Sequence, residues 1–266
     1  MPKIPVNDIE IHYREQGVGF PLVLLHGLNG DLTGWALVMP ELAKHFRTIA
    51  LDIRGHGESG KPDQPYSIKE FSEDLREFLR RLKIPQANIL GLSMGGAIAQ
   101  QFTLDYPQMV RALVLISTFS YIDEPCRRAF LRLRESLSTG GYPAFFDTVV
   151  QLAFTPQYTA ANPTAIAELK EKRIRTNSPL AIGRANDACL AFHLKDEIAG
   201  IRHPTLVISG REDVFTPIHL AEQIHKAIYH SEWKILEGVG HNLYIEKASQ
   251  LTQIVLDFLK KVPADD

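Results

Sequence analysis

The sequence predicts an α/β protein in which helices flank an eight-stranded, mostly parallel sheet. Short runs rich in Val, Ile and Leu alternate with segments of helical periodicity, which is typical of parallel strands buried on both faces. With 266 residues, of which 45% are hydrophobic and 23% charged, the chain can bury a large core as one domain. The same composition excludes disordered, collagen-like and coiled-coil proteins.

The predicted strands are bounded by turn residues. The first two flank Asn7-Asp8 and are expected to form an antiparallel hairpin. Ligands of open α/β sheets bind beyond the carboxyl ends of the strands, so the residues that follow the later runs are site candidates. The eight runs are residues 3–6, 9–14, 21–25, 47–52, 87–92, 111–117, 204–209 and 232–237.

The helices between these runs have readable ends. Ser67 and Glu70 form a capping box ahead of a helix with one apolar face. Thr216 and Pro217 are interpreted as the N-cap and first residue of a later helix. Two sets of apolar residues repeat at helical spacing and should pack on the sheet: Ile68, Phe71, Leu75, Phe78, Leu79 and Leu82, and near the C-terminus Leu251, Ile254, Val255, Phe258 and Leu259.

The alternation of strands and helices is interrupted over residues 119–200, where helical patterns continue without a strand. Prolines punctuate this stretch, among them Pro125, Pro143, Pro163 and Pro179. It is interpreted as an inserted helical cap that covers the site, with residues 1–118 and 201–266 forming the α/β core.

Charge and cysteine content narrow the function classes. A formal net charge of −2 lacks the positive field of a nucleic-acid binder, so no nucleic-acid partner is expected. Cys126 and Cys189 are the only cysteines and have no metal or disulfide spacing. Residues 1–16 contain no continuous apolar stretch that would make a secretory signal or a membrane anchor. A cytoplasmic protein is expected.

The strongest local motif is Gly91-Leu92-Ser93-Met94-Gly95, a G-x-S-x-G pattern directly after a predicted strand and before a predicted helix. A serine at such a turn sits in a strained backbone and projects its hydroxyl into a cleft. Ser93 is therefore the candidate nucleophile, and the alternative is an ordinary turn serine beside packing glycines.

A serine hydroxyl is a poor nucleophile at neutral pH until a base takes its proton, and the pKa of histidine suits that role. His241 lies in a glycine-rich loop after the last strand, at the carboxyl edge of the sheet, and is the candidate base. The other histidines lie on outer elements or polar helix faces, where solvated roles are expected, or in other turns.

The acid that orients this base should also follow a strand, and Asp213 follows the run 204–209. The order Ser93, Asp213, His241 is that of hydrolases with a nucleophile elbow. Glu212 and Asp123 are alternative acids, and Asp213 could also merely cap the helix that begins near Thr216.

An acyl-transfer site also needs hydrogen-bond donors for the developing oxyanion. The backbone N–H groups of Met94 and Leu28 are the candidates, because Leu28 lies in the loop His26-Gly27-Leu28-Asn29-Gly30 after the strand 21–25. His26 is interpreted as a structural residue that ties this loop together.

A second glycine pattern, Gly55-His56-Gly57-Glu58-Ser59-Gly60, matches the dinucleotide fingerprint G-x-G-x-x-G. The proline-containing segment 61–65 after it cannot open a helix, so no helix N-terminus is available for a pyrophosphate. No metal-ligand spacing is present either, so neither a dinucleotide nor a metal is expected.

Together these segments resemble the α/β-hydrolase superfamily over nearly the whole chain, and most closely its small capped esterases and lactonases. Residues 140–146 also look like the cap of 3-oxoadipate enol-lactonases and aminoacrylate hydrolases. The segments that carry the resemblance are His26-Gly27, residues 52–59, the Ser93 turn, Gly210-Arg211-Glu212-Asp213 and Gly240-His241.

The resemblance implies the α/β-hydrolase fold and a cofactor-free esterase with an acyl-enzyme intermediate on Ser93. Superfamily members that use aspartate at the Ser93 position, the haloalkane dehalogenases and epoxide hydrolases, are disfavoured. The expected partner is a small-molecule ester or lactone held in an apolar pocket, for which the candidates are Trp35, Phe119, Phe145, Phe146, Phe154, Val214 and Leu243. Ordinary packing is the alternative for the cap members.

Other functions stay open at this level. The same three residues could hydrolyse an enol-lactone or a carbon–carbon bond of a diketone acid, or belong to a slow-turnover ligand receptor. The crowded cap arginines, Arg127, Arg128, Arg132 and Arg134, could recognise a substrate carboxylate, but a solvated helix face is the more usual place for arginine.

Overall fold

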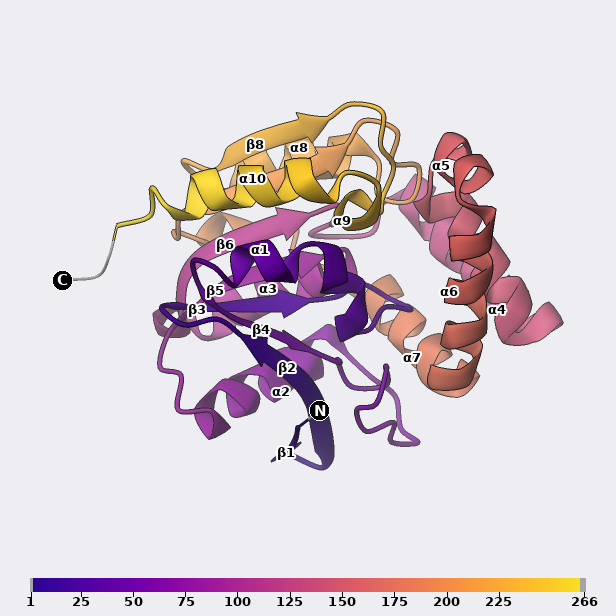
Figure 1. Ribbon diagram of the computed structural model, residues 1–266, viewed down its shortest axis with the longest axis horizontal. Coiled ribbons are helices and arrows are strands. Elements are labelled where there is room, and N and C mark those ends of the chain that lie inside the picture. Colours follow the sequence, from indigo (N-terminus) through magenta and orange to yellow (C-terminus); the bar gives the residue numbers. More distant parts are fainter. Residues whose placement is uncertain (1, 264–266) are drawn as a thin grey trace.

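The computed structural model describes residues 2–263, so residue 1 and residues 264–266 of the predicted core segments lie outside the described part of the chain. Figure 1 shows the arrangement of the elements. The strands are β1 (Lys3–Val6), β2 (Ile9–Gln16), β3 (Pro21–Leu25), β4 (Arg47–Leu51), β5 (Ala87–Leu92), β6 (Val110–Ile116), β7 (Thr205–Gly210) and β8 (Glu232–Leu236). The helices are η1 (Leu32–Leu37), α1 (Met39–Leu42), α2 (Ile68–Arg81), α3 (Met94–Asp105), η2 (Pro107–Met109), α4 (Glu124–Ala153), α5 (Pro156–Ala161), α6 (Pro163–Thr176), α7 (Pro179–Leu190), η3 (Glu197–Gly200), α8 (Ile218–Ala227), α9 (Leu243–Glu246) and α10 (Ala248–Leu259).

The predicted eight-stranded, mostly parallel sheet is confirmed. Its strand order is β1-β2-β4-β3-β5-β6-β7-β8, with antiparallel pairing only where β2 meets β1 and β4. The predicted strand ends are correct to within two residues, because turn residues bound each apolar run. The parallel strands bring the loops after β3, β5, β7 and β8 to one edge of the sheet.

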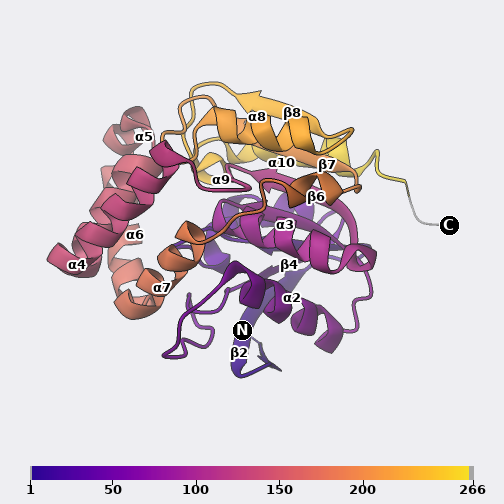
Figure 2. The same cartoon turned by 180° about the vertical axis from the view of Figure 1, so that it is seen from behind.

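Two apolar cores cover the two faces of the sheet. Helices α1 and α10 lie on the face seen in Figure 1, and α2, α3 and α8 lie on the face seen in Figure 2. The side chain of Ser67 accepts a hydrogen bond from the Glu70 N–H at 3.0 Å, as the capping pattern predicts. Helix α2 then buries Phe71, Leu75 and Phe78 against the sheet.

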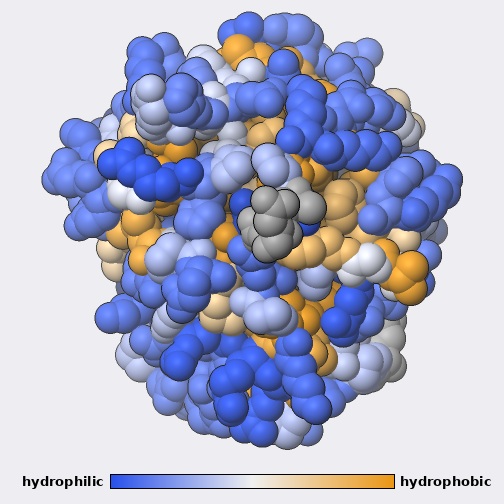
Figure 3. All heavy atoms as spheres, turned by 90° about the vertical axis from the view of Figure 1, so that its left-hand side faces the viewer, coloured by the Kyte–Doolittle hydropathy of each residue, from blue (hydrophilic) through white to orange (hydrophobic). Residues whose placement is uncertain are grey.

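Helices α4 to α7, called the cap helices below, lie between β6 and β7 in the chain and beside the carboxyl edge of the sheet (Figures 1 and 2). Helix α4 is bent at Gly141, whose φ of 65° is non-helical, and Pro143 follows two residues later. The opposite end of the molecule has a mainly hydrophilic surface with scattered apolar side chains (Figure 3). Among the helices of residues 2–263, none combines the length and apolar character needed to cross a bilayer.

Candidate active site

Ser93 lies at a sharp turn between β5 and α3. Its backbone has φ of 55° and ψ of −118°, a combination that a residue with a side chain rarely adopts. The Ser93 N–H donates to Ile116 O at 2.9 Å, and Thr118 Oγ1 donates to Ser93 O at 2.7 Å. The turn is thus held from the neighbouring strand, and the predicted strand, turn and helix around Ser93 are present.

Glycines on either side of Ser93 allow this turn to be tight. A Cβ added to Gly91 would lie 2.3 Å from Gly95 O, and one added to Gly95 would lie 2.2 Å from Leu25 O. Both distances are well inside van der Waals contact, so β3, β5 and α3 can approach this closely only without those side chains. The G-x-S-x-G pattern therefore has a steric cause in this chain.

His241 follows β8 and is paired with Asp213. His241 Nδ1 lies 2.8 Å from Asp213 Oδ2, and both side chains are buried. Because a carboxylate can only accept, Nδ1 carries the hydrogen in this pair, and the lone pair of the imidazole lies on Nε2. This tautomer is the one that a general base requires.

Three further hydrogen bonds fix the Asp213 carboxylate. Oδ1 accepts from the N–H groups of Phe215 at 2.9 Å and Thr216 at 2.8 Å. Oδ2 accepts from the Thr216 hydroxyl at 2.8 Å, and this hydroxyl also lies 3.1 Å from His241 Nδ1. The expectation that Thr216 caps the next helix is therefore wrong by one residue: Pro217 is the N-cap of α8, and the Thr216 hydroxyl is used by the carboxylate.

The alternative acids lie elsewhere. Glu212 is exposed, and its N–H donates to Val239 O at 3.1 Å. Asp123 caps α4 through the Cys126 N–H at 3.0 Å and pairs with His219 Nε2 at 2.5 Å. Neither contacts His241, so the structure pairs the histidine with Asp213.

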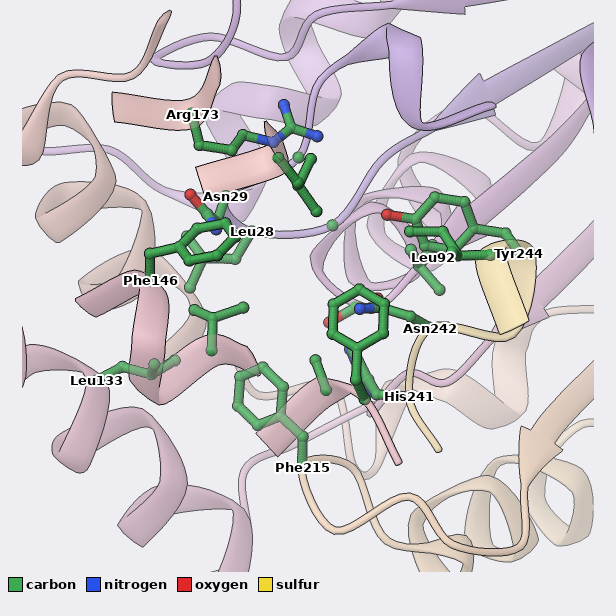
Figure 4. Close-up of a pocket in the computed structure, with 18 residues that line it drawn as sticks. Leu28, Asn29, Leu92, Leu133, Phe146, Arg173, Phe215, His241, Asn242 and Tyr244 are labelled. Atoms are coloured by element: carbon green, nitrogen blue, oxygen red, sulfur yellow. The ribbon is translucent and has the colours of Figure 1, made fainter. Parts of the chain in front are cut away.

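Ser93 and His241 line one cavity of about 50 Å³ between the sheet edge and the cap helices (Figure 4). No hydrogen bond joins the two side chains in residues 2–263. Catalytic hydrogen bonds are often long in a protein without its substrate and tighten on binding, so the shared cavity is the informative feature.

The two predicted oxyanion donors flank this serine. Met94 begins α3 directly after Ser93, and Leu28 lines the cavity. Within the described chain, neither N–H donates to a protein acceptor. The loop that carries Leu28 lies against the serine, since a Cβ on Gly27 would come 3.1 Å from Ser93 Cβ. Both N–H groups are thus available to a ligand beside Ser93.

His26 ties this loop to the core, as the sequence predicts. Its Nδ1 lies 2.8 Å from Gly27 O, and its Nε2 accepts from the Ile53 N–H at 3.0 Å. Burial lowers the pKa of His26, which keeps the ring neutral and able to accept that hydrogen bond.

The glycine-rich segment 55–60 forms turns and is followed by irregular chain up to α2, so it lacks the helix of a dinucleotide site. Asp52 is buried beneath it and accepts from the Leu32 N–H at 2.7 Å and the Glu58 N–H at 2.8 Å. Within residues 2–263, no three His, Cys, Asp or Glu side chains gather as metal ligands could.

The cavity wall is mainly apolar. Of the predicted pocket residues, Phe146 and Phe154 line it. Sequence reasoning missed other wall residues, including Phe215, whose ring lies 4.9 Å from the His241 ring. Figure 4 shows Phe146 and Leu133 on one side of the cavity and Leu92 and Tyr244 on the other.

Five predicted pocket residues do not line this cavity. Val214 is 60% exposed, because consecutive residues of the turn after Asp213 point in opposite directions and Phe215 faces inward. Leu243 packs in the core under α10, while its neighbour Tyr244 takes the wall position. In both cases the residue that lines the cavity is the next one in the chain after the predicted residue.

The other three are packed behind the wall. The Trp35 ring lies 5.2 Å from the ring of Tyr244, which separates it from the cavity. Phe119 is buried between Phe130 and Phe192, at ring distances of 5.7 and 6.0 Å. Phe145 is buried, its ring lies 5.7 Å from the ring of Tyr142, and it does not line the cavity.

One arginine does reach the cavity, but it is not in the predicted cluster. Arg127, Arg128, Arg132 and Arg134 are all exposed on α4, as expected of a solvated face. Arg173 of α6 is buried, lines the cavity and forms an ion pair with Asp31. The sequence around Arg173 does not distinguish it from the exposed charged residues of the same helix, so its burial could not be predicted.

Comparison with known proteins agrees with this fold. Residues 21–248 match the family model of the alpha/beta hydrolase fold. The chain is 31% identical to the enol-lactonase from Burkholderia xenovorans, with a TM-score of 0.92 over 98% of this chain and 100% of that one. It is 29% identical to the 2-hydroxy-6-oxo-2,4-heptadienoate hydrolase of Pseudomonas putida, over 95% of this chain and 94% of that one.

A thermophilic esterase from Thermogutta terrifontis is 25% identical, with a TM-score of 0.89 over 99% of both chains. These proteins are similar to this chain over nearly its whole length, and their names give them different substrates. The chain belongs to the alpha/beta hydrolase fold family, and hydrolysis is the activity that its family and relatives support.

Proposed function

We propose that the protein is a serine hydrolase that cleaves small carboxylic esters, lactones included, through an acyl-enzyme on Ser93. The observation that carries the proposal is that Ser93 and His241 line one cavity while Asp213 Oδ2 lies 2.8 Å from His241 Nδ1. This arrangement fits acyl transfer, in which a base must face both the nucleophile and the leaving group.

In the first half of the reaction, Ser93 Oγ attacks the ester carbonyl carbon and its proton passes to His241 Nε2. The carbonyl oxygen becomes an oxyanion, to which the N–H groups of Leu28 and Met94 donate. When the tetrahedral intermediate collapses, the carbon–oxygen bond to the alcohol breaks, and the alkoxide leaves with the proton from His241. The acyl group is then bound to Ser93.

In the second half, water takes the place of the alcohol. His241 removes a proton from the water, the hydroxide attacks the acyl carbon, and the same two N–H groups stabilise the second oxyanion. Collapse returns the proton to Ser93 Oγ and releases the carboxylic acid. The cycle needs only side chains, backbone groups and water, so the proposal includes no cofactor.

The cavity supports a short acyl group. Its volume of about 50 Å³ is room for roughly four water molecules. We therefore expect acetyl to butyryl chains to be accepted more readily than octanoyl or longer chains. The proposal therefore includes a cap formed by residues 119–200 and a preference for acyl chains of about four carbons or fewer.

Lactone hydrolysis is a second form of the same chemistry and is favoured by one observation, the 31% identity to an enol-lactonase across almost the whole chain. A lactone is an internal ester, so the same attack opens the ring and the alcohol stays attached to the acyl group. A cytoplasmic location is proposed on the cysteine content of the sequence alone.

The test is hydrolysis of p-nitrophenyl esters from C2 to C12 and of small lactones, by the wild type and Ser93→Ala in parallel. A fluorophosphonate, followed by mass spectrometry, reports the nucleophile independently of substrate choice. Ser120→Ala is the matched control, since Ser120 is also a buried serine, at the start of the segment 119–200, but does not line the cavity.

Activity on C2 to C4 esters that is lost only in Ser93→Ala, with the label on Ser93, is the expected result. Labelling without ester or lactone turnover would favour a carbon–carbon substrate or a ligand receptor. Absence of any label on Ser93 would remove it as nucleophile and overturn the proposal.

A further inference from the structure

The cap helices are joined to the oxyanion loop, residues 26–33, by a buried polar cluster. The Tyr142 hydroxyl of α4 donates to Asn29 Oδ1. Asn177, at the end of α6, donates from Nδ2 to Tyr142 Oη at 2.8 Å and to Asn29 Oδ1 at 3.2 Å. All three side chains are buried, so these hydrogen bonds form away from competing water.

Within residues 2–263, the remaining hydrogen bond of Asn29 also comes from this cluster, a long contact of 3.5 Å from Asn177 Nδ2 to Asn29 O. The Asn29 backbone is left-handed, with φ of 65°, a conformation that a non-glycine residue adopts at a cost. On either side the core holds the loop: the Ile53 N–H donates to His26 Nε2, and the Leu32 N–H donates to Asp52. The stretch 28–29 between these points takes its hydrogen bonds from the cap helices alone.

A second contact anchors the loop two residues further on. Arg173 of α6 forms an ion pair with Asp31, and Lys172 Nζ lies 3.3 Å from the same carboxylate. Burial would raise the pKa of Asp31, but the charge of Arg173 and the hydrogen bond from Thr33 outweigh it and lower the pKa to about 2. The pair is thus charged at neutral pH, and Arg173 is already neutralised by Asp31.

The bend in α4 explains how Tyr142 reaches the loop. Gly141 has a left-handed φ of 65°, and the helix changes direction immediately before Tyr142. Burial raises the pKa of the Tyr142 phenol to about 12, so its hydroxyl keeps its proton and donates at all physiological pH values. A phenylalanine there would keep the packing against Phe145 but lose the donor.

We infer that Tyr142 and Asn177 are positioning residues that act through Asn29 to hold the Leu28 N–H against the reacting carbonyl, with Arg173 as a second anchor. Assembly of the oxyanion site then depends on the seating of the cap helices. A cap displaced to admit substrate leaves Leu28 without its support, and the donor is in place only when the cap is closed. This inference rests on the proposed function.

The test compares Tyr142→Phe and Asn177→Ala, called the clamp variants below, with the wild type and with Arg184→Gln. Arg184 is the matched control because it also joins the cap helices to the core, donating to Pro62 O at 3.0 Å, but lies outside the oxyanion loop and the cavity. We would measure kcat and KM for p-nitrophenyl butyrate, and the inhibition constant of a trifluoromethyl ketone, which forms a tetrahedral oxyanion adduct with serine.

Loss of a whole oxyanion donor lowers kcat about 10² to 10³-fold, and a misplaced donor should lower it about 10 to 100-fold. The expected result is this fall in kcat for both clamp variants, with KM within about threefold, and a matching rise in the inhibition constant. Arg184→Gln should change none of these values. Melting temperatures identify any variant that is simply unfolded. If one clamp variant is unfolded, the kcat, KM and inhibition constant of the other clamp variant test the inference.

Several outcomes would overturn the inference. A rise in KM at constant kcat would mean that the cluster only holds the cap shut. Equal losses in Arg184→Gln would mean a general effect of cap attachment. A fall in kcat with an unchanged inhibition constant would mean that the oxyanion site is intact. A wild type without Ser93-dependent turnover would overturn the proposed function and this role with it.

Discussion

Replacing Asp213 by Asn tests whether this carboxylate supports the base. The introduced amide would have nearly the same size as the carboxylate and could keep one acceptor for the N–H groups of Phe215 and Thr216. It would lack the negative charge that faces His241 at 2.8 Å. It could also present N–H to the imidazole and favour the wrong tautomer.

The magnitude follows from the geometry. His241 becomes positively charged in the transition state, with its charge centre about 4 Å from the carboxylate, where two unit charges interact by about 4 kcal/mol at an effective dielectric constant of about 20. Since about 1.4 kcal/mol is tenfold in rate, Asp213→Asn should lower kcat about 10³-fold. KM should change little, because the charge develops only in the transition state.

The assay is steady-state hydrolysis of p-nitrophenyl acetate, with Glu212→Gln and Asp123→Asn as controls for the alternative acids. Both controls should stay within about threefold of the wild type, because neither side chain contacts His241. A loss smaller than about tenfold in Asp213→Asn, or an equal loss in Asp123→Asn, would refute the assignment.

Three further predictions use the same structure. Thr216→Val removes the hydroxyl that donates to Asp213 Oδ2. It should lower kcat about tenfold with little change in melting temperature. An unchanged kcat and pH–rate profile would show that the hydroxyl is dispensable. Phe146→Ala should enlarge the cavity, lower stability by about 3–5 kcal/mol and move the ester preference above C4, whereas an unchanged chain-length profile would place the acyl group elsewhere. Burial lowers the pKa of His56 to about 3. Between pH 6.5 and pH 3 this histidine is therefore protonated in the unfolded chain but neutral in the folded chain. The free energy of unfolding should fall as the pH drops through this range. Urea unfolding at about pH 6.5 and about pH 4.5 gives the loss of stability in the wild type and in His56→Asn. The loss should be smaller in His56→Asn by about 1.4 kcal/mol per pH unit. Equal losses in both proteins would contradict this assignment to His56.

The sequence by itself determined the fold and the segments of the candidate site. Strand ends such as those of β3 and β5 could be predicted because parallel strands are continuous apolar runs that turn residues interrupt. Ser93, Asp213 and His241 could be selected because each follows such a run, and the carboxyl ends of parallel strands meet at one edge.

Only the tertiary structure decided which side chains of those segments face the cavity. Val214 and Phe215 are apolar neighbours in a turn whose N–H groups donate to Asp213, yet only Phe215 lines the cavity while Val214 is exposed. Asn29 and Tyr142 are 113 residues apart, and their contact depends on the bend of α4 at Gly141 and on how the cap helices sit on the sheet. Local periodicity reports the secondary structure of a segment, whereas contacts between distant segments arise from packing, which no single segment encodes.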